Sequence, residues 1–218
     1  MIIDFHSHIF PDKIANSTIS SLKSKSGNNA YTDGTVDGLI NSVINNGADI
    51  SITLPVLTKP TQFDSVSRFI IEVNERFAFK KRKIISFGGI HPLCDDIYGK
   101  MKFLKDNGVK GVKIHPDYQS TYINDQGYID IINSAKELDM IVVTHSGVDE
   151  GYKDRPIMCP PELVKQVINK TKWNKFVLAH YGGNLLWNEV YDTLAGLDVY
   201  FDTAVTLGKL MKNCLRRF

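Results

Sequence analysis

Short apolar runs rich in β-branched and aromatic residues recur along the chain, and the segments between them carry helical patterns. The clearest helical stripe consists of Val36, Leu39, Ile40, Val43 and Ile44, whose spacing indicates one buried helix face. A second stripe, over residues 66–77, has the same spacing. Seven apolar runs predict strands, at residues 2–5, 50–54, 84–87, 109–114, 141–144, 176–179 and 199–201.

Cap residues support these boundaries. Thr35 can cap the start of the first of these helices and Gly47 its end, and Pro161 stands where the first turn of a helix accepts proline. Strictly alternating strands and helices predict a parallel sheet, and strands that are apolar throughout predict a sheet covered on both faces. Both a (β/α) barrel and a doubly wound sheet fit this pattern.

The positions of the histidines separate the two folds. In a barrel the chemistry sits at the carboxyl ends of several strands at once, whereas a doubly wound sheet concentrates it at one switch point. The sequence contains neither GxGxxG nor GxxxxGK[ST], the phosphate-binding motifs of doubly wound folds. We therefore predict an α/β fold of the TIM (β/α)8 barrel type. The chain has six histidines, each at or just after the end of a predicted strand: His6, His8, His91, His115, His145 and His180.

His6 and His8 form the first candidate ligand pair. One residue separates them, so on an extended strand both side chains project to the same face. Two imidazoles at this spacing suit zinc, manganese or iron, and a carboxylate such as Asp4 can fix the tautomer of a ligating histidine. The pair alone is weak evidence, because histidines at this spacing also occur on ordinary surfaces.

Three further strand ends strengthen the metal hypothesis. His115, His145 and His180 each follow an apolar run, and glycine comes soon after the last two. A structural histidine needs only one or two hydrogen-bond partners and has no reason to prefer strand ends. Repeated imidazoles at strand ends therefore favour a functional cluster over packing.

Together these motifs resemble the amidohydrolase superfamily, and more closely its amidohydrolase-related branch, which includes the aminocarboxymuconate-semialdehyde-type decarboxylases. The resemblance implies that His6, His8 and His145 ligate one metal ion. It also implies that His180 either joins the ligands or acts as an acid/base beside the ion. The resemblance covers nearly the whole chain and rests on residues 4–8 (DFHSH), 111–116 (GVKIHP), 144–147 (THSG) and 178–183 (LAHYGG).

One expected feature of that family is missing from the sequence. Its members carry an aspartate on strand eight, usually in a Gly-Thr-Asp-like turn, and no such turn follows residues 199–204 here. Residues 207–218 have helical spacing and are predicted to form the helix after strand seven. We expect a single barrel domain over residues 1–218 that lacks its last strand and helix, exposes apolar surface near Ile3 and Phe5, and has low activity or none.

The remaining strand-end residues are assigned to substrate binding, each with an alternative. Lys113 is expected to contact a substrate anion, although in binuclear relatives such a lysine is carbamylated and bridges two metals. His115 lines the pocket or turns the chain, and His91, also followed by proline, is the weaker candidate of the two. Asp202 contacts the substrate or a group behind the ligands, or caps a loop.

Composition and charge exclude other function classes. Lys and Arg number 26 and Asp and Glu 24, a formal net charge of +2 without long charged blocks, so neither nucleic acid nor a membrane is an expected partner. The three cysteines form no metal or redox spacing, which fits a reducing compartment and a cytoplasmic location. No basic leader and no apolar run of about 18 residues is present.

These features predict a metal-dependent hydrolase of a small polar substrate, such as a cyclic amide, lactone or ester. The cofactor is one divalent ion, zinc before manganese or iron, which activates water for attack. His180 is the candidate catalytic acid/base. The alternatives are a decarboxylase of an aromatic or unsaturated acid, which uses the same ligands, and a non-catalytic barrel that binds metal or ligand. The substrate and the oligomeric state, a homo-oligomer included, are left open.

Overall fold

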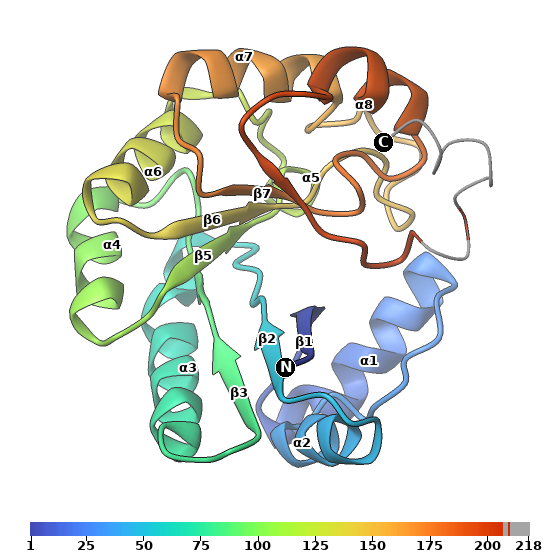
Figure 1. The fold of residues 1–218 in the computed structure, drawn as a ribbon, viewed down its shortest axis with the longest axis vertical. Coiled ribbons are helices and arrows are strands. Elements are labelled where there is room, and N and C mark those ends of the chain that lie inside the picture. The colour runs from blue at the N-terminus through green and yellow to red at the C-terminus, as the bar shows by residue number, and fades with distance from the viewer. Residues whose placement is uncertain (207–208, 210–218) are drawn as a thin grey trace.

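Parallel strands form the central layer of the protein, and helices cover their outer face (Figure 1). The computed structural model describes residues 1–206 and 209, so the helix predicted over residues 207–218 lies almost entirely outside the described residues. The elements are β1 (Ile3–Ser7), α1 (Asp12–Ser26), α2 (Val36–Asn45), β2 (Ile50–Thr53), the 3-10 turn η1 (Pro60–Gln62), α3 (Phe63–Phe77), β3 (Lys83–Ser86), β4 (Gly88–Gly89), α4 (Ile97–Asp106), β5 (Gly111–Ile114), α5 (Pro116–Gln119), α6 (Gln126–Glu137), β6 (Ile141–Thr144), α7 (Pro161–Thr171), β7 (Phe176–Leu178), α8 (Trp187–Leu194) and β8 (Tyr200–Phe201).

The strands follow one another in space as they do in sequence. The order is β1-β2-β3 in one sheet and β4-β5-β6-β7-β8 in the next, and all pairs are parallel. Each of the seven predicted strands is present. The third is divided into β3 and β4 at Phe87, which accounts for the eighth label. Sequential parallel strands with outer helices confirm the predicted α/β barrel fold.

The predicted caps are confirmed. The hydroxyl of Thr35 accepts a hydrogen bond of 2.9 Å from the amide of Gly38 at the start of α2, and Pro161 opens α7. The predicted stripe of residues 66–77 lies within α3. Within the described part of the chain, no helix is long and apolar enough to cross a membrane.

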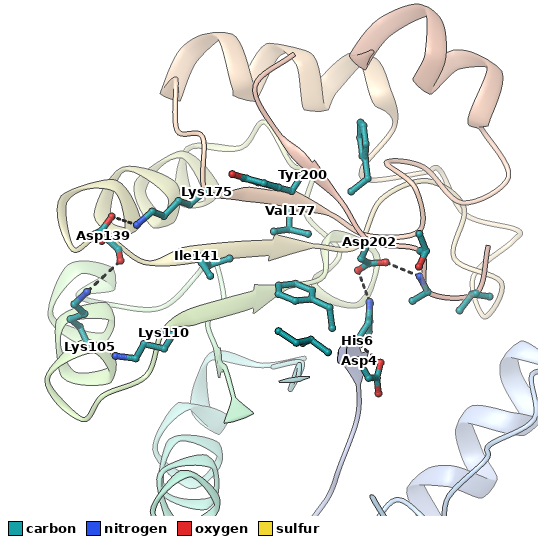
Figure 2. Close-up of a pocket in the computed structure, with 16 residues that line it drawn as sticks. Asp4, His6, Lys105, Lys110, Asp139, Ile141, Lys175, Val177, Tyr200 and Asp202 are labelled. Atoms are coloured by element: carbon teal, nitrogen blue, oxygen red, sulfur yellow. Dashed lines mark hydrogen bonds and ion pairs between the residues drawn. The ribbon is translucent and has the colours of Figure 1, made fainter. Parts of the chain in front are cut away.

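An open seam separates β1 from β8. Among residues 1–206 and 209, no strand pairing joins the two edges, and a cavity of about 1140 Å³ runs between them (Figure 2). Ile3 is 43% exposed beside it, as the sequence predicted, whereas Phe5 is half-buried because its ring packs edge-on against Phe87. At the mouth end of the seam, Asp202 just after β8 reaches His6 on β1.

A buried glutamine joins the strands beneath the barrel mouth. The Gln119 amide donates to the carbonyls of Leu57 and Ile90, at 2.9 and 2.8 Å. Its oxygen accepts from the amide of His115 and from the hydroxyl of Tyr128, at 3.1 and 2.8 Å. Because all four bonds are buried, this side chain positions the segment that carries His115.

We expect Gln119→Leu to lower the free energy of unfolding by about 2–4 kcal/mol, because it leaves buried donors and acceptors without partners. Gln166→Leu is the matched control: Gln166 is exposed and accepts one bond from Asn124, so the change should stay within about 0.5 kcal/mol. Urea unfolding followed by circular dichroism measures both, and equal stability of the two variants would contradict the role of Gln119.

Candidate metal centre

Five of the six histidines gather at the carboxyl ends of the strands. Ring centroids lie 5.1 Å apart for His6 and His8, 5.2 Å for His6 and His180, 5.0 Å for His180 and His145, and 4.1 Å for His145 and His115. The structure thus brings together every histidine predicted for the site. His91 contributes to a turn instead, where its Nδ1 accepts from the amide of Leu93 at 3.2 Å.

Hydrogen bonds fix the tautomers of three of these rings. Nδ1 of His8 lies 2.9 Å from the carbonyl oxygen of Leu54, and Nδ1 of His180 lies 3.0 Å from that of Ala204. A carbonyl only accepts, so both Nδ1 atoms carry the proton and both Nε2 atoms keep a lone pair. The 2.7 Å contact of His6 Nδ1 with Asp202 has the same consequence. Neutral imidazoles held in this way are the usual form of histidine metal ligands.

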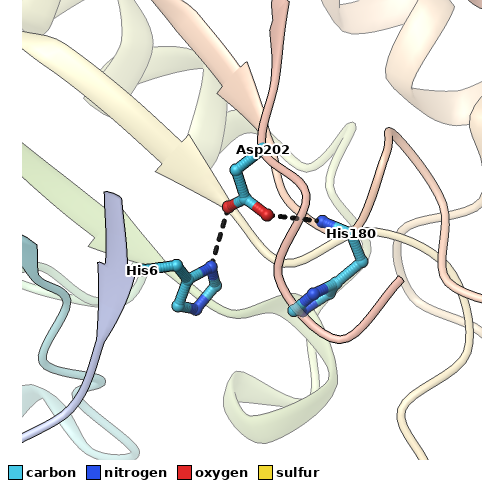
Figure 3. Close-up of side chains that lie close together, drawn as sticks. All are labelled: His6, His180 and Asp202. Atoms are coloured by element: carbon cyan, nitrogen blue, oxygen red, sulfur yellow. Dashed lines mark hydrogen bonds and ion pairs between the residues drawn. The ribbon is translucent and has the colours of Figure 1, made fainter. Parts of the chain in front are cut away.

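Asp202 supplies the carboxylate of the site. Oδ2 contacts His6, and Oδ1 accepts from the amide of His180 at 2.9 Å (Figure 3). Oδ1 also accepts from the amide of Ala204 at 3.0 Å. Burial acts to raise its pKa, but the His6 hydrogen bond and the charge of Lys113 outweigh this and hold the pKa well below its usual range. Ligand atoms of His6, His180 and Asp202 lie within 4.8 Å of one another, a grouping that fits a metal ion.

This arrangement changes two expectations. The sequence predicted a site without its carboxylate, and it left Asp202 to contact the substrate, to contact a group behind the ligands or to cap a loop. The structure places Asp202 against His6, and the same side chain also accepts from the loop amide of Ala204. Asp4 was expected to orient a histidine ring, but it accepts from Ser51 at 2.9 Å and from the backbone of His6. The sequence does not show that the Asp202 side chain reaches His6 across the seam, because the strand before it, β8, has only two residues and gives no clear pattern of alternating faces.

A strained turn holds His180. Both His180 and Tyr181 have φ of +59°, a left-handed conformation that costs about 1 kcal/mol or more for residues with a side chain. Three contacts offset this strain. Asp202 accepts from the His180 amide through its side chain and from the Tyr181 amide through its carbonyl, and the Trp187 indole donates to the His180 carbonyl at 3.1 Å.

Lys113 is a buried cation at the base of the site. It is 1% exposed, and its Nζ has no hydrogen-bond partner among the described residues. Burial lowers its pKa to about 8. An ammonium group in this state favours an anion from outside the chain. The substrate contact of Lys113 and its alternative, carbamylation, both stay predictions.

His115 and His145 form a second group with two carboxylates that the sequence analysis missed. The two rings stack with planes 7° apart, His115 Nε2 lies 3.4 Å from Asp149, and His145 Nε2 lies 3.8 Å from Asp117. Ligand atoms of His115, His145 and Asp149 also lie within 4.8 Å of one another. A signal existed, since Asp117 and Asp149 follow strand-end histidines by two and four residues.

Burial shifts the pKa of nearly every group in the site. It lowers the pKa of His6, His115 and His145 well below the ordinary value, and neighbouring charges such as Lys113 act in the same direction. Burial raises the pKa of Asp117 to about 6. Neutral imidazoles at neutral pH are therefore available as ligands.

The histidines open into a cleft of about 940 Å³. One wall is a stripe of α1 with small polar and apolar side chains, among them Ile14, Ser17 and Thr18. Tyr118 and Tyr152, with ring centroids 5.3 Å apart, also line the cleft. A cleft of this size holds a small organic molecule.

Comparison with known proteins shows the fold alone. No protein-family model and no curated protein matches the chain. A putative amidohydrolase from Staphylococcus aureus is 13% identical, with a TM-score of 0.65 over 99% of this chain and 82% of that one. A probable 2-pyrone-4,6-dicarboxylic acid hydrolase from Acinetobacter baumannii is 12% identical, with a TM-score of 0.59 over 93% and 69%. A manganese-bound 5-carboxyvanillate decarboxylase from Novosphingobium aromaticivorans is 12% identical, with a TM-score of 0.60 over 88% and 69%. The amidohydrolase resemblance is thus confirmed for the fold.

Metal-free protein should lose stability as the pH falls from 7.5 to 5.5. An unfolded histidine takes up its proton near pH 6.5, but burial lowers the pKa of all five clustered histidines, so they stay neutral in the folded state: His6, His8, His115, His145 and His180. Acid therefore favours the unfolded chain, and each histidine contributes up to about 1.4 kcal/mol per pH unit. The raised pKa values of Asp117 and Asp149 act in the opposite sense, two carboxylates against five histidines. Urea unfolding with a chelator at three pH values measures this, and His145→Gln should reduce the slope. A slope of zero would refute the assignment.

Proposed function

We propose that the protein is a metal-dependent hydrolase of a small, polar, anionic substrate such as a cyclic amide, lactone or ester that carries a carboxylate. One observation carries the proposal: ligand atoms of His6, His180 and Asp202 lie within 4.8 Å of one another, and the cleft that His6 and His180 line is also lined by Lys113, whose ammonium has no partner among the described residues. A metal-binding group beside a buried cation suits a substrate with both a reactive carbonyl and a negative charge.

His6, His180 and Asp202 fit a divalent ion, with His8, whose ring lies 5.1 Å from that of His6, as the next imidazole. The family resemblance places His145 in the same ligand set, but its ligand atom is grouped with those of His115 and Asp149. Imidazole and carboxylate donors suit zinc, and manganese or iron fit the same set. When bound, the ion supplies Lewis acidity toward a substrate carbonyl and makes water a stronger acid.

The residues of the chain bind and orient the substrate and move its protons. The Lys113 ammonium binds the substrate carboxylate at the base of the cleft. His115, which directly follows the same strand, restricts the orientation of the bound substrate. His180 keeps its Nδ1 proton on the Ala204 carbonyl, so its Nε2 is the atom that takes or returns a proton when it is not occupied as a ligand.

The runner-up is decarboxylation of an aromatic or unsaturated acid. The depth of Lys113 supports it, because a carboxylate bound at that ammonium is withdrawn from water, and the cleft walls include aromatic rings. The products separate the two reactions. Incubation of zinc- and manganese-loaded protein with panels of lactones, cyclic amides, esters and aromatic acids should yield ring-opened or hydrolysed products, whereas carbon dioxide release without hydrolysis would favour the runner-up. No turnover in either panel would support a non-catalytic barrel.

The double variant His6→Ala/His8→Ala should lose the metal ion of this group, because it removes two of its donors. Metal content by mass spectrometry after dialysis, with circular dichroism to check folding, measures the loss. His91→Ala, a strand-end histidine outside the cluster, is the control and should keep the ion. Full retention in the folded double variant would show that the pair are not ligands.

Lys113→Met should raise KM for a carboxylate-bearing substrate by about 10-fold to 100-fold, since a buried charge-assisted hydrogen bond contributes about 1.5–3 kcal/mol. The control is Lys110→Met, an exposed position shortly before the same strand. Steady-state kinetics on the charged substrate and its neutral methyl ester should show the effect for the charged one alone. An equal effect on both would contradict an anion contact.

A further inference from the structure

Two buried polar atoms beside the first site have no partner. Among the described residues, His145 Nε2 and Asp117 Oδ2 make no hydrogen bond, although both side chains are about 5% exposed and the two atoms lie 3.8 Å apart. Leaving such atoms unsatisfied costs about 1–3 kcal/mol each. The pair therefore marks a place where something from outside the chain binds.

His115 and Asp149 complete a donor set around that place. His115 stacks on His145, and its Nε2 lies 3.4 Å from Asp149 Oδ2. Zinc bonds of about 2.1 Å separate two tetrahedral ligand atoms by roughly 3.4 Å. The existing spacing thus matches an ion without rearrangement of the backbone.

Charge points to a cation rather than an anion. Among the described residues, Asp117 and Asp149 form ion pairs only with histidine rings, and no lysine or arginine lies within ion-pair distance of either. Two buried carboxylates with two neutral imidazoles carry two negative charges, which one divalent ion balances.

We propose that His115, His145 and Asp149, with Asp117 beside them, form a second divalent-cation site, separate from the group of His6, His180 and Asp202. The mixture of imidazole and carboxylate donors selects a transition ion such as zinc or manganese over calcium or magnesium. The site does not depend on which reaction the protein catalyses.

Binding requires one exchange of hydrogen bonds. Nδ1 of His115 now accepts from the amide of Tyr118 at 3.4 Å, at the long end of the hydrogen-bond range. Coordination through Nε2 moves the proton to Nδ1 and gives up that contact. Because the contact is long, the loss is small beside the energy of a metal bond.

An ion here would also tether the segment after β6. Asp149 lies on that segment, and Asp117 Oδ1 accepts from the amide of Met158 at 3.3 Å near its other end. Lys153 between them is exposed and accessible to trypsin, whereas Arg155 precedes Pro156, a bond that trypsin does not cleave. Occupancy should therefore slow tryptic cleavage at Lys153.

The test is titration of metal-free protein with zinc, followed by calorimetry and metal analysis. The wild type should bind two equivalents, Asp149→Asn and His115→Gln one each, and Asp202→Asn should lose the other ion. Asp154→Asn, an exposed carboxylate of the same segment, is the matched control and should bind two. Zinc should slow tryptic cleavage at least several-fold in the wild type and in Asp202→Asn, but not in Asp149→Asn.

If the wild type binds one equivalent of zinc, and if Asp202→Asn abolishes this binding while Asp149→Asn retains it, the second site alone is overturned. His145 Nε2 and Asp117 Oδ2 would then be assigned to water. No zinc bound by the wild type would overturn both this site and the metal dependence of the proposed function. Thermal unfolding of each variant distinguishes loss of a ligand from loss of the fold.

Discussion

The contact between Asp202 Oδ2 and His6 Nδ1, at 2.7 Å, connects the two strands that flank the open seam. Elsewhere around the sheet, neighbouring strands are joined by backbone hydrogen bonds, but within the described residues β1 and β8 have none in common. The same carboxylate also accepts from the His180 amide. One side chain therefore positions the first strand, the strained turn after β7 and two candidate ligands, so the geometry of the site depends on it.

The two donor groups differ in their electrostatic balance. The first group has one carboxylate, that of Asp202, beside the imidazoles of His6 and His180. Lys113 adds a positive charge that helps to keep the pKa of both histidines low. In the second, Asp117 and Asp149 bring two negative charges without a basic side chain close to them in the described structure. The first group is thus suited to an anionic substrate, while the second attracts a cation.

The barrel fold could be predicted because its signals are local. Apolar runs, helical stripes and the caps at Thr35 and Pro161 each follow from neighbouring residues, and the structure agrees with them. The gathering of the histidines was predictable from strand ends alone, since parallel strands deliver their carboxyl ends to one side. The partners of those histidines were not, because the contact of His6 with Asp202 spans 196 positions and depends on the tilt of two strands rather than on any motif. Asp149 was missed for a similar reason: the path of the segment after β6 determines where its side chain points.

A site built across a seam couples ligand binding to the stability of the strand edges. An ion held by His6 from β1 and by His180 and Asp202 from the β7 and β8 side would bridge the gap where backbone pairing is lacking. Because the unfolded chain does not hold these donors together, such an ion stabilises only the folded state, by about 2.7 kcal/mol when its concentration is a hundred times Kd. At the mouth of the seam, the ion would thus connect β1 to β8, as backbone hydrogen bonds connect the other neighbouring strands. The far end, where Ile3 and Tyr200 are exposed beside the cavity, would gain nothing from it. Opening of the barrel should therefore begin at that far end and reach the metal donors last.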